Sequence, residues 1–252
     1  MATPTAQTAD FTLEKFETGH VPAEVFAGVK RLFSENYREA NEAYLERNLG
    51  KLRYLSVARA SDGRFAGFAL GELRVLDLPR APQTNVSLAG LCCVGAEFRR
   101  HGLFGKLESL AIGRGAPDEN NRYLSAGRTA HPASFRNFFR NPNAVPHPGR
   151  RPTEWQQQVG SAVAKAYGSP GFDPETFVVK GSGVPIGWPI IEIEATPEEW
   201  AMFEHVDRAN GDSLLGIAWA PTPPEGGWIP NPTSRRVRPP ETVPSSASPT
   251  AG

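Results

Sequence analysis

One stretch decides the fold class of this chain: Leu88-Ala-Gly-Leu-Cys-Cys-Val-Gly-Ala-Glu-Phe-Arg-Arg-His-Gly-Leu-Phe-Gly-Lys-Leu107. It begins as an apolar strand that ends at Val94, continues through a short loop with two adjacent arginines, and enters a helix rich in leucine. Glycine lets the backbone approach a ligand closely, and the start of a helix presents unpaired N–H groups with positive partial charge. The stretch therefore predicts a binding site for a phosphate or pyrophosphate group.

Four side chains of the loop and early helix add full or potential positive charge: Arg99, Arg100, His101 and Lys106. Two common phosphate signatures are missing here. There is no Gly-x-x-x-x-Gly-Lys-Ser/Thr, and Gly102 with Gly105 do not complete Gly-x-Gly-x-x-Gly. The alternative interpretation is a strand–loop–helix unit whose charged loop is simply solvated.

At these residues the chain resembles the GNAT superfamily of N-acetyltransferases. The family pattern is an apolar strand ending in Val, an acidic residue, Arg/Gln-x-x-Gly-x-Gly/Ala and a leucine-rich helix. The residues that follow this pattern, in order, are Val94, Glu97, Arg99, Gly102, Leu103 and Leu107. Phe104 departs from it, because it stands at the usual second Gly or Ala, with Gly105 just after it.

The resemblance implies an α/β (α+β) fold with a mixed, mostly antiparallel central sheet flanked by helices, to which this chain adds a C-terminal extension. It also implies that the loop backbone wraps the pyrophosphate of acetyl-CoA or another acyl-CoA, and that the preceding strand pairs with the pantetheine arm. The next strand of the family splays away and opens a slot for the thioester. The residues expected at the cofactor are Leu91, Cys92, Cys93, Val94, Arg99, Arg100, His101, Gly102, Leu103, Phe104 and Gly105.

Acyl transfer to an amine needs a donor to the thioester oxygen, a base for the ammonium proton and an acid for the leaving thiolate. The resemblance makes the N–H near Cys93 or Val94 the candidate donor. Glu72 is a candidate base, since its strand is expected on the acceptor side, with a solvent-facing charge as the alternative. His131 is a second candidate, as a base or a cofactor contact, with helix capping as its alternative.

The acid is missing from its usual place. The tyrosine of the family falls at Phe138 or Phe139, neither of which donates a proton. Ser134, another tyrosine or water must then protonate the thiolate. Cys93 is a conceivable nucleophile for a covalent intermediate, but an apolar strand raises a thiol pKa and favours an inert core cysteine.

The composition limits the partners. The chain has 252 residues, with 27 Lys and Arg against 27 Asp and Glu, so its formal net charge is zero. A neutral balance argues against a general nucleic-acid binder. No apolar run approaches the roughly 18 residues that span a bilayer, and the polar N-terminus lacks the apolar core of a secretory signal. We therefore expect neither nucleic acid nor a membrane as a partner.

The two cysteines, Cys92 and Cys93, are adjacent and make poor disulfide partners, because neighbours on a strand point to opposite faces. No His and Cys cluster has the spacing of a metal site, so no metal is expected. These features predict a reduced, cytoplasmic protein, and the frequent Ala, Arg, Gly and Pro indicate a bacterial source.

Hydrophobic periodicity and turn signals predict the order of elements. We expect helices over residues 21–33, 39–48, 98–111, 131–140, 152–167 and 196–210. We expect strands over residues 53–59, 65–75, 86–94, 123–129, 177–180 and, as a last edge strand, 214–219, with a hairpin turn at 61–64 and an exposed loop over 76–85.

The chain divides into four predicted parts. Residues 1–10 form a loose tail, residues 11–149 a GNAT-like acyl-CoA-binding core, and residues 150–220 an extension that packs on the core and shapes the acceptor pocket. The Pro-rich residues 221–252 are expected to be disordered or draped over the surface.

The expected function is acyl-CoA-dependent N-acylation, with acetyl-CoA as donor, of an unidentified small-molecule or peptide amine by direct transfer, in a monomer or homodimer. Two alternatives stay open. One is a GNAT-fold protein without transferase activity that acts as a CoA-binding sensor or partner-binding module. The other is a GNAT-fold enzyme of specialised metabolism with other acyl chemistry.

Overall fold

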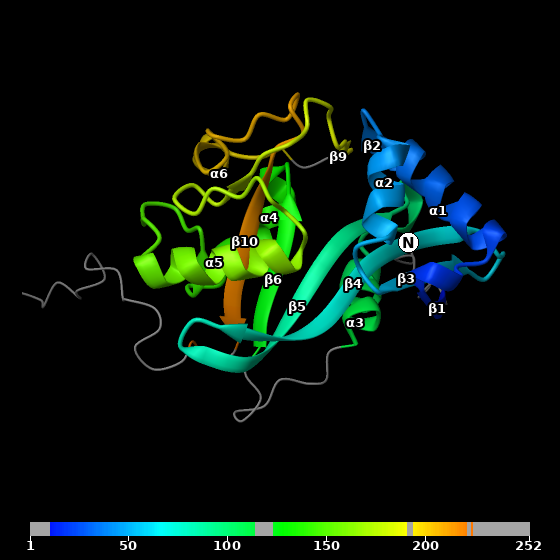
Figure 1. The fold of residues 1–252 in the computed structure, drawn as a ribbon. Coiled ribbons are helices and arrows are strands. Elements are labelled where there is room, and N and C mark those ends of the chain that lie inside the picture. The colour runs from blue at the N-terminus through cyan, green and yellow to red at the C-terminus, as the bar shows by residue number, and fades with distance from the viewer. Residues whose placement is uncertain (1–10, 114–122, 191–193, 221–222, 224–252) are drawn as a thin grey trace, which may run out of the picture.

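The computed structural model describes residues 11–113, 123–190, 194–220 and 223, so the tails expected at 1–10 and 221–252 lie outside the described residues apart from residue 223 (Figure 1). The strands are β1 (Phe11–Glu17), β2 (Tyr37–Arg38), β3 (Tyr54–Ala60), β4 (Phe65–Leu78), β5 (Ala81–Val94), β6 (Tyr123–Thr129), β7 (Ala144–Val145), β8 (Val178–Val179), β9 (Trp188–Pro189) and β10 (Ser213–Ala220). The helices are α1 (Ala23–Asn36), α2 (Glu42–Leu49), α3 (Leu103–Ile112), α4 (Pro132–Phe139), α5 (Glu154–Ala166) and α6 (Pro197–Ala201). No described helix is long and apolar enough to cross a bilayer.

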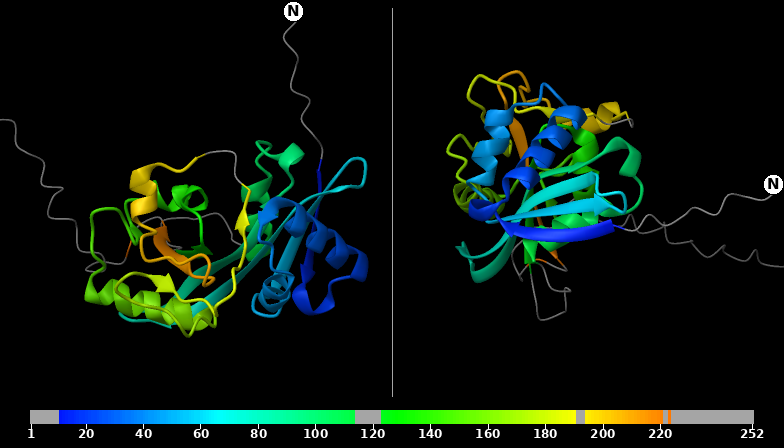
Figure 2. Two further views of the ribbon diagram at one scale, coloured as in Figure 1. Left: turned by 90° about the horizontal axis from the view of Figure 1, so that it is seen from above. Right: turned by 90° about the vertical axis from the view of Figure 1, so that its right-hand side faces the viewer.

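A large sheet organises the described residues, in the order β1-β3-β4-β5-β6-β10-β7, with β8 also paired to β10. Its pairs are antiparallel except β5 with β6, which run parallel. Strand β1 lies at one edge, beside β3 (Figure 2). This is the mixed, mostly antiparallel sheet that the sequence predicted.

The parallel pair separates partway along. Strands β5 and β6 are paired from Asn85 with Tyr123 to Ala89 with Gly127, and beyond that point β5 stays with β4 up to Val94. Figure 1 shows the two strands diverging upward from their shared end. The strand that follows the phosphate-type loop therefore splays away, as expected.

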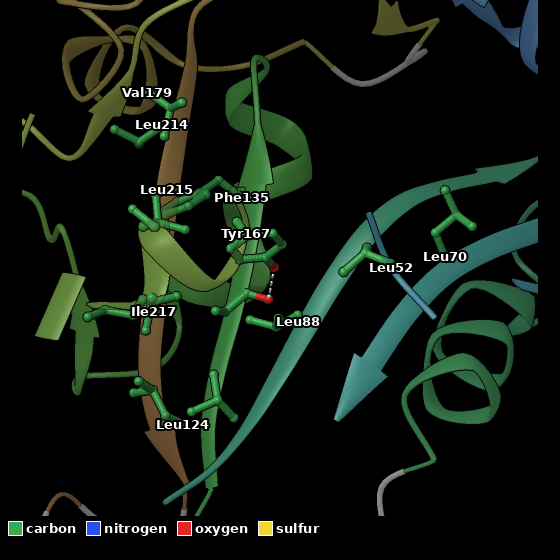
Figure 3. Packing of buried hydrophobic residues seen from close by; sticks show 14 of the residues in the cluster. Leu52, Leu70, Leu88, Leu124, Phe135, Tyr167, Val179, Leu214, Leu215 and Ile217 are labelled. Carbon is green, nitrogen blue, oxygen red and sulfur yellow. Dashed lines mark hydrogen bonds between the residues drawn. The ribbon is translucent and has the colours of Figure 1, made fainter. Parts of the chain in front are cut away.

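A hydroxyl from the C-terminal part of the chain sits at the point of separation. Tyr167, which follows α5, directs its hydroxyl to the carbonyl oxygens of Ala89 and Ala126, each at 2.8 Å. Figure 3 shows the Tyr167 side chain reaching between β5 and β6. The ring is buried, so the two carbonyls share its single hydroxyl proton at the place where the ladder ends.

The helices cover the two faces of the sheet in a fixed arrangement. A Cβ at Gly71 would meet Ala111 and Ile112 of α3, and one at Gly127 would meet Phe138 of α4. Gly71, Ala89 and Gly127 are cross-strand partners and so share a face, which places α3 and α4 together. Helices α1, α2, α4 and α5 all contribute buried side chains to the main hydrophobic cluster, part of which Figure 3 shows.

The C-terminal part completes this sheet. Strand β10 lies between β6 and β7, so the expected edge strand is an interior one, and the predicted boundary at residue 149 does not mark the end of the sheet. Seven of its eight residues are buried, which is typical of a strand covered on both faces. Residues 213–220 of the predicted extension thus belong to the same sheet as the strands of the predicted core.

Three predicted boundaries also change. The exposed loop expected over 76–85 is a tight hairpin, because Leu78 and Ala81 pair directly and are buried. The helix expected over 98–111 begins only at Leu103, since left-handed backbone at Arg100 and Gly102 delays it. The helix expected over 196–210 has the predicted capping box but ends at Ala201, where tighter turns take over.

Replacing Tyr167 by Phe removes the hydroxyl and leaves two buried carbonyls without their donor. We expect the free energy of unfolding to fall by about 2 kcal/mol. Urea denaturation measures the change, with Tyr54→Phe as the control, because no hydrogen bond of the Tyr54 hydroxyl is formed with a described residue. Equal stability of the two variants would contradict the bridging role.

Candidate functional site

A cavity of about 520 Å³ occupies the space between the diverging strands. Its walls come from the end of β5, the end of β6, the loop before α3, helix α4 and two segments outside the sheet. The lining residues include Ala89, Gly90, Leu91, Cys92, Cys93, Val94, Arg99, Arg100, Gly102, Leu103, Phe104, Gly127, Arg128, Thr129 and Ser134. Among the described residues that line it, Glu108 is the one that carries a carboxylate.

The loop before α3 exposes the head of that helix. Gly102 adopts φ +71°, and Cβ atoms added at Gly102 or Gly105 would meet nothing within 4 Å. The first amides of a helix have no partner inside the helix. The N–H groups that follow Gly102 therefore face open space beside the cavity, in the arrangement that favours an anion.

Arg99 fixes this loop to the rest of the fold. Its Nη2 donates to Oδ1 of Asn36 at 3.1 Å, and its Nε donates to the carbonyl oxygen of Val94 at 3.3 Å. Asn36 is nearly buried and donates in turn to the carbonyl of Leu32. Arg99 thus holds the loop against α1 and keeps its positive charge at the cavity wall.

Two of the predicted cofactor residues point elsewhere. His101 is exposed, with Nδ1 3.3 Å from the carbonyl oxygen of Phe98, and it does not line the cavity. Gly105 does not line it either. The other nine predicted cofactor residues, Leu91, Cys92, Cys93, Val94, Arg99, Arg100, Gly102, Leu103 and Phe104, are all brought to its wall.

The end of β5 directs alternate amides toward and away from β4. The N–H of Gly95 donates to the carbonyl of Ala66, at 2.9 Å, on the β4 side. Hydrogen-bonded pairs alternate along an antiparallel ladder, so the Cys93 amide also faces β4. The backbone N–H of Cys93 is therefore directed toward β4, inside the sheet.

Cys92 and Val94 face the opposite way. The carbonyl of Cys92 accepts from the Tyr37 hydroxyl at 3.0 Å, and that of Val94 accepts from Arg99. Their amides lie on the same side as these carbonyls, away from β4. Of the two residues expected to supply the thioester donor, Val94 is the one whose N–H is turned toward the cavity.

The thiols are held in their neutral form. Burial raises the pKa of Cys93 to about 12, and burial also raises the pKa of Cys92 well above its ordinary value. A thiol is a nucleophile only as the thiolate. The geometry thus agrees with an inert core cysteine at position 93.

Glu72 lies away from the cavity. Both of its carboxylate oxygens accept from Arg74, at 2.7 and 2.8 Å, and one also accepts from the backbone N–H of Arg53. Arg74 in turn donates to the carbonyls of Lys51 and Ala166, so the pair links β4 to α5. The candidate base is a structural anchor, because its lone pairs are engaged and no cavity wall includes it.

His131 caps helix α4. Its Nδ1 accepts from the N–H of Ala133 at 3.2 Å, and its ring lies edge-on to Trp200. Burial, and then the nearby charges of Arg208 and Arg136, lower the pKa of His131. It does not line the cavity, so the capping alternative describes it, whereas Ser134 stands at the wall.

The place of the usual tyrosine is taken by an apolar ring. Phe138 lines the cavity and stacks on Phe135, with ring centroids 5.0 Å apart. Two tyrosines that the sequence did not mark, Tyr37 of β2 and Tyr44 of α2, reach the same cavity. Their approach depends on tertiary packing, and no local sequence signal marks it.

A segment of the C-terminal part closes one wall. Ile186, Gly187, Pro189 and Ile190 line the cavity. They are held by pairing of β9 with β2, and the N–H of Ile190 donates to the carbonyl of Asn36 at 2.8 Å. Residues 186–190 thus tie the C-terminal part to the α1–α2 connection and add apolar surface to the site.

The capping role of His131 predicts how the stability of the fold depends on pH. Since the pKa of His131 in the folded chain lies below its ordinary 6.5, the unfolded chain binds this proton more readily. Stability from the cap is fully present above about pH 6.5 and is lost as the pH falls below it. Urea midpoints at pH 7.5 and 5.5 should show wild type losing more than His131→Asn, because Asn caps without titrating. His20→Asn, at an exposed histidine, should follow wild type, and parallel losses in all three would refute the idea.

Comparisons with known proteins give only distant structural likenesses. No family model matches this chain, and no curated protein matches it. Among solved structures, a glucosamine N-acetyltransferase region of a fungal multi-domain β-N-acetylglucosaminidase is similar over 49% of this chain and 14% of its own, at 16% identity and a TM-score of 0.34. A GNAT-family N-acetyltransferase from Escherichia coli in complex with CoA is similar over 55% of this chain and 71% of its own, at 18% identity and a TM-score of 0.33.

An aminoglycoside acetyltransferase from an uncultured soil metagenomic sample is similar over 40% of this chain and 66% of its own, at 17% identity and a TM-score of 0.29. At these TM-scores the likeness carries no weight for function, which must be inferred from the geometry of this chain's own residues. In the described residues, the strand order, the separation of β5 from β6 and the loop at the head of α3 agree with the mixed, mostly antiparallel sheet flanked by helices that the sequence predicted.

Proposed function

We propose that this chain transfers an acyl group from an acyl-CoA, with acetyl-CoA as the first donor to test, directly to an amine. The observation that carries the proposal is the open helix head at Gly102 beside a cavity that continues between β5 and β6. A diphosphate placed before α3 would meet unpaired amides and the charges of Arg99 and Arg100. The thioester arm would then extend along the end of β5.

The residues present fit that donor. Cys92 and Val94 turn their backbone polar groups away from β4, so the arm would pair with them as an added strand. The Val94 amide would donate to the thioester oxygen, whose negative charge grows during attack. The neutral thiol at Cys93 supports direct transfer, because it offers no thiolate to form an acyl-enzyme.

Transfer requires proton movement at both ends. The attacking amine must lose a proton, and the CoA sulfur must gain one as its bond to the acyl carbon breaks. Hydroxyls at the wall belong to Tyr37, Tyr44, Thr129, Ser134 and Ser213. The hydroxyl of Tyr37 donates to the carbonyl of Cys92 and that of Thr129 to the carbonyl of His131, while that of Ser213 accepts from Arg128. We propose that Tyr44 or Ser134, directly or through water, supplies the proton that the tyrosine of the family supplies at the position of Phe138.

Acetyl-CoA binding is the first test of this function. Calorimetry should detect binding below millimolar concentration, and release of the CoA thiol should follow when an amine panel is added. Binding without turnover on any amine would favour the alternative of a CoA-binding module. No heat and no thermal shift at millimolar acetyl-CoA would end the proposal altogether.

Gly102→Val tests the loop. Valine at φ +71° is strained, and its side chain would enter the space before the helix head. We expect acetyl-CoA affinity to fall at least tenfold in a folded protein. Gly149→Val is a matched control, since Gly149 has φ +69° and equally open surroundings but does not line the cavity. Normal affinity in folded Gly102→Val would contradict the loop assignment.

A further inference from the structure

Arg128 stands at the end of β6, at the wall of the cavity. Its guanidinium is held by two nearly buried serines. Nε and Nη2 donate to the hydroxyl of Ser213 at 3.1 and 2.9 Å, and Nη1 donates to that of Ser169 at 2.9 Å. Three of the five N–H donors of an arginine are thereby used. One N–H on each terminal nitrogen remains, so the guanidinium keeps two donors for a carboxylate.

No carboxylate of the described residues lies within ion-pair distance of this guanidinium. Two other part-buried arginines do have such partners, since Arg74 pairs with Glu72 and Arg136 with Glu199. Arginine that is withdrawn from water without an anion is costly to keep. The Arg128 guanidinium is oriented by neutral hydroxyls and lies at a cavity wall, so it is placed to bind the anionic group of a ligand.

A second cation reinforces this end of the cavity. Lys51 and Arg128 line a small adjoining cavity of about 30 Å³, together with Tyr44, Asn48 and Tyr167, and its described lining contains no Asp or Glu. Burial, followed by repulsion from Arg128, lowers the pKa of Lys51. Two like charges therefore gather at this end of the cavity.

The position of Arg128 on the sheet separates it from the helix head. Gly127 faces α4, so Arg128, the next residue along the strand, points to the opposite face. Its bond to Ser169, just beyond α5, agrees with that direction. The head of α3 lies on the face that α3 and α4 share. The cavity thus has a phosphate-type end on one face and an arginine end on the other.

We propose that Arg128, supported by Lys51, binds a carboxylate of the acceptor, and that the acceptors of this chain are amino acids or other amino carboxylic acids. The inference rests on the proposed function, because it assigns the arginine end to the acceptor and the helix head to the donor. Tyr44, which lines both cavities, lies where the acceptor enters.

Matched compounds test the proposal. Phenylalanine, leucine and serine are each compared with the corresponding amide and decarboxylated amine as acceptors of the acetyl group. In parallel, binding of each N-acetyl amino acid and of its amide is measured by calorimetry with CoA present, so that a result does not depend on turnover. Wild type should prefer the acid form of at least one series by ten- to a hundredfold, the range of a charged hydrogen bond.

Variants then assign the preference to Arg128. Arg128→Met should remove the preference while acetyl-CoA binding stays normal, and Arg128→Lys should keep part of it. Arg151→Met, at an exposed arginine, should behave as wild type. Melting curves check that each variant is folded. If Arg128→Met does not fold, Arg128→Lys and Ser169→Ala replace it, and each should show a weaker preference for the acid form than wild type.

Three results would overturn the proposal. One is equal use and equal binding of acids and amides by wild type. Another is a preference for the acid form that remains in folded Arg128→Met. The third is that Arg128→Met changes the choice between succinyl-CoA and acetyl-CoA but not the choice of acceptor, because the carboxylate would then arrive on the acyl group. A wild-type protein that does not bind acetyl-CoA would instead refute the proposed function.

Discussion

The separation of β5 from β6 after Ala89 and Gly127 is the constraint on which the rest of the structure depends. A sheet that stayed paired to its end would leave no room for a ligand between these strands. Separation exposes backbone groups that the ladder would have satisfied, and that exposure must be balanced. Tyr167 accomplishes this at the branch point, where one hydroxyl reaches a carbonyl from each strand. A residue far along the chain therefore stabilises the gap in which the cavity lies.

The two ends of the cavity differ in how they are charged. At the head of α3 the positive character is spread over backbone amides and two loop arginines, which suits a large, multiply charged group. At Arg128 it is concentrated in one planar fork aligned by serines, which suits a compact anion. Apolar residues 186–190 and the Phe135–Phe138 pair lie between and beside them.

The sequence predicted the parts of the fold that local chemistry controls. Strand β6, the hairpin turn at Gly63 and the proline start of α4 follow from periodicity and turn residues and are confirmed. The prediction that residues 214–219 form an edge strand was wrong, because the order of strands depends on which apolar surfaces remain uncovered as the chain folds. The glycines and basic residues of the loop before α3 predicted a cofactor site, and nine of the residues named for it line the cavity. Glu72 was misread, since nothing local reveals that Arg74 and the Arg53 amide occupy its oxygens. The sequence does not mark Arg128, because a charged residue at the end of a strand usually faces solvent.

The interior place of β10 also bears on how the chain is made. Strand β6 pairs with residues that lie at least 85 positions further along, the nearest pair being Thr129 with Leu214. On a ribosome, one edge of β6 stays bare until nearly the whole described chain has emerged, and bare apolar edges invite wrong pairing. Such distant pairing also slows folding. The nascent protein is thus most exposed to aggregation shortly before its last strand is inserted, which makes that interval the stage at which a chaperone would matter most.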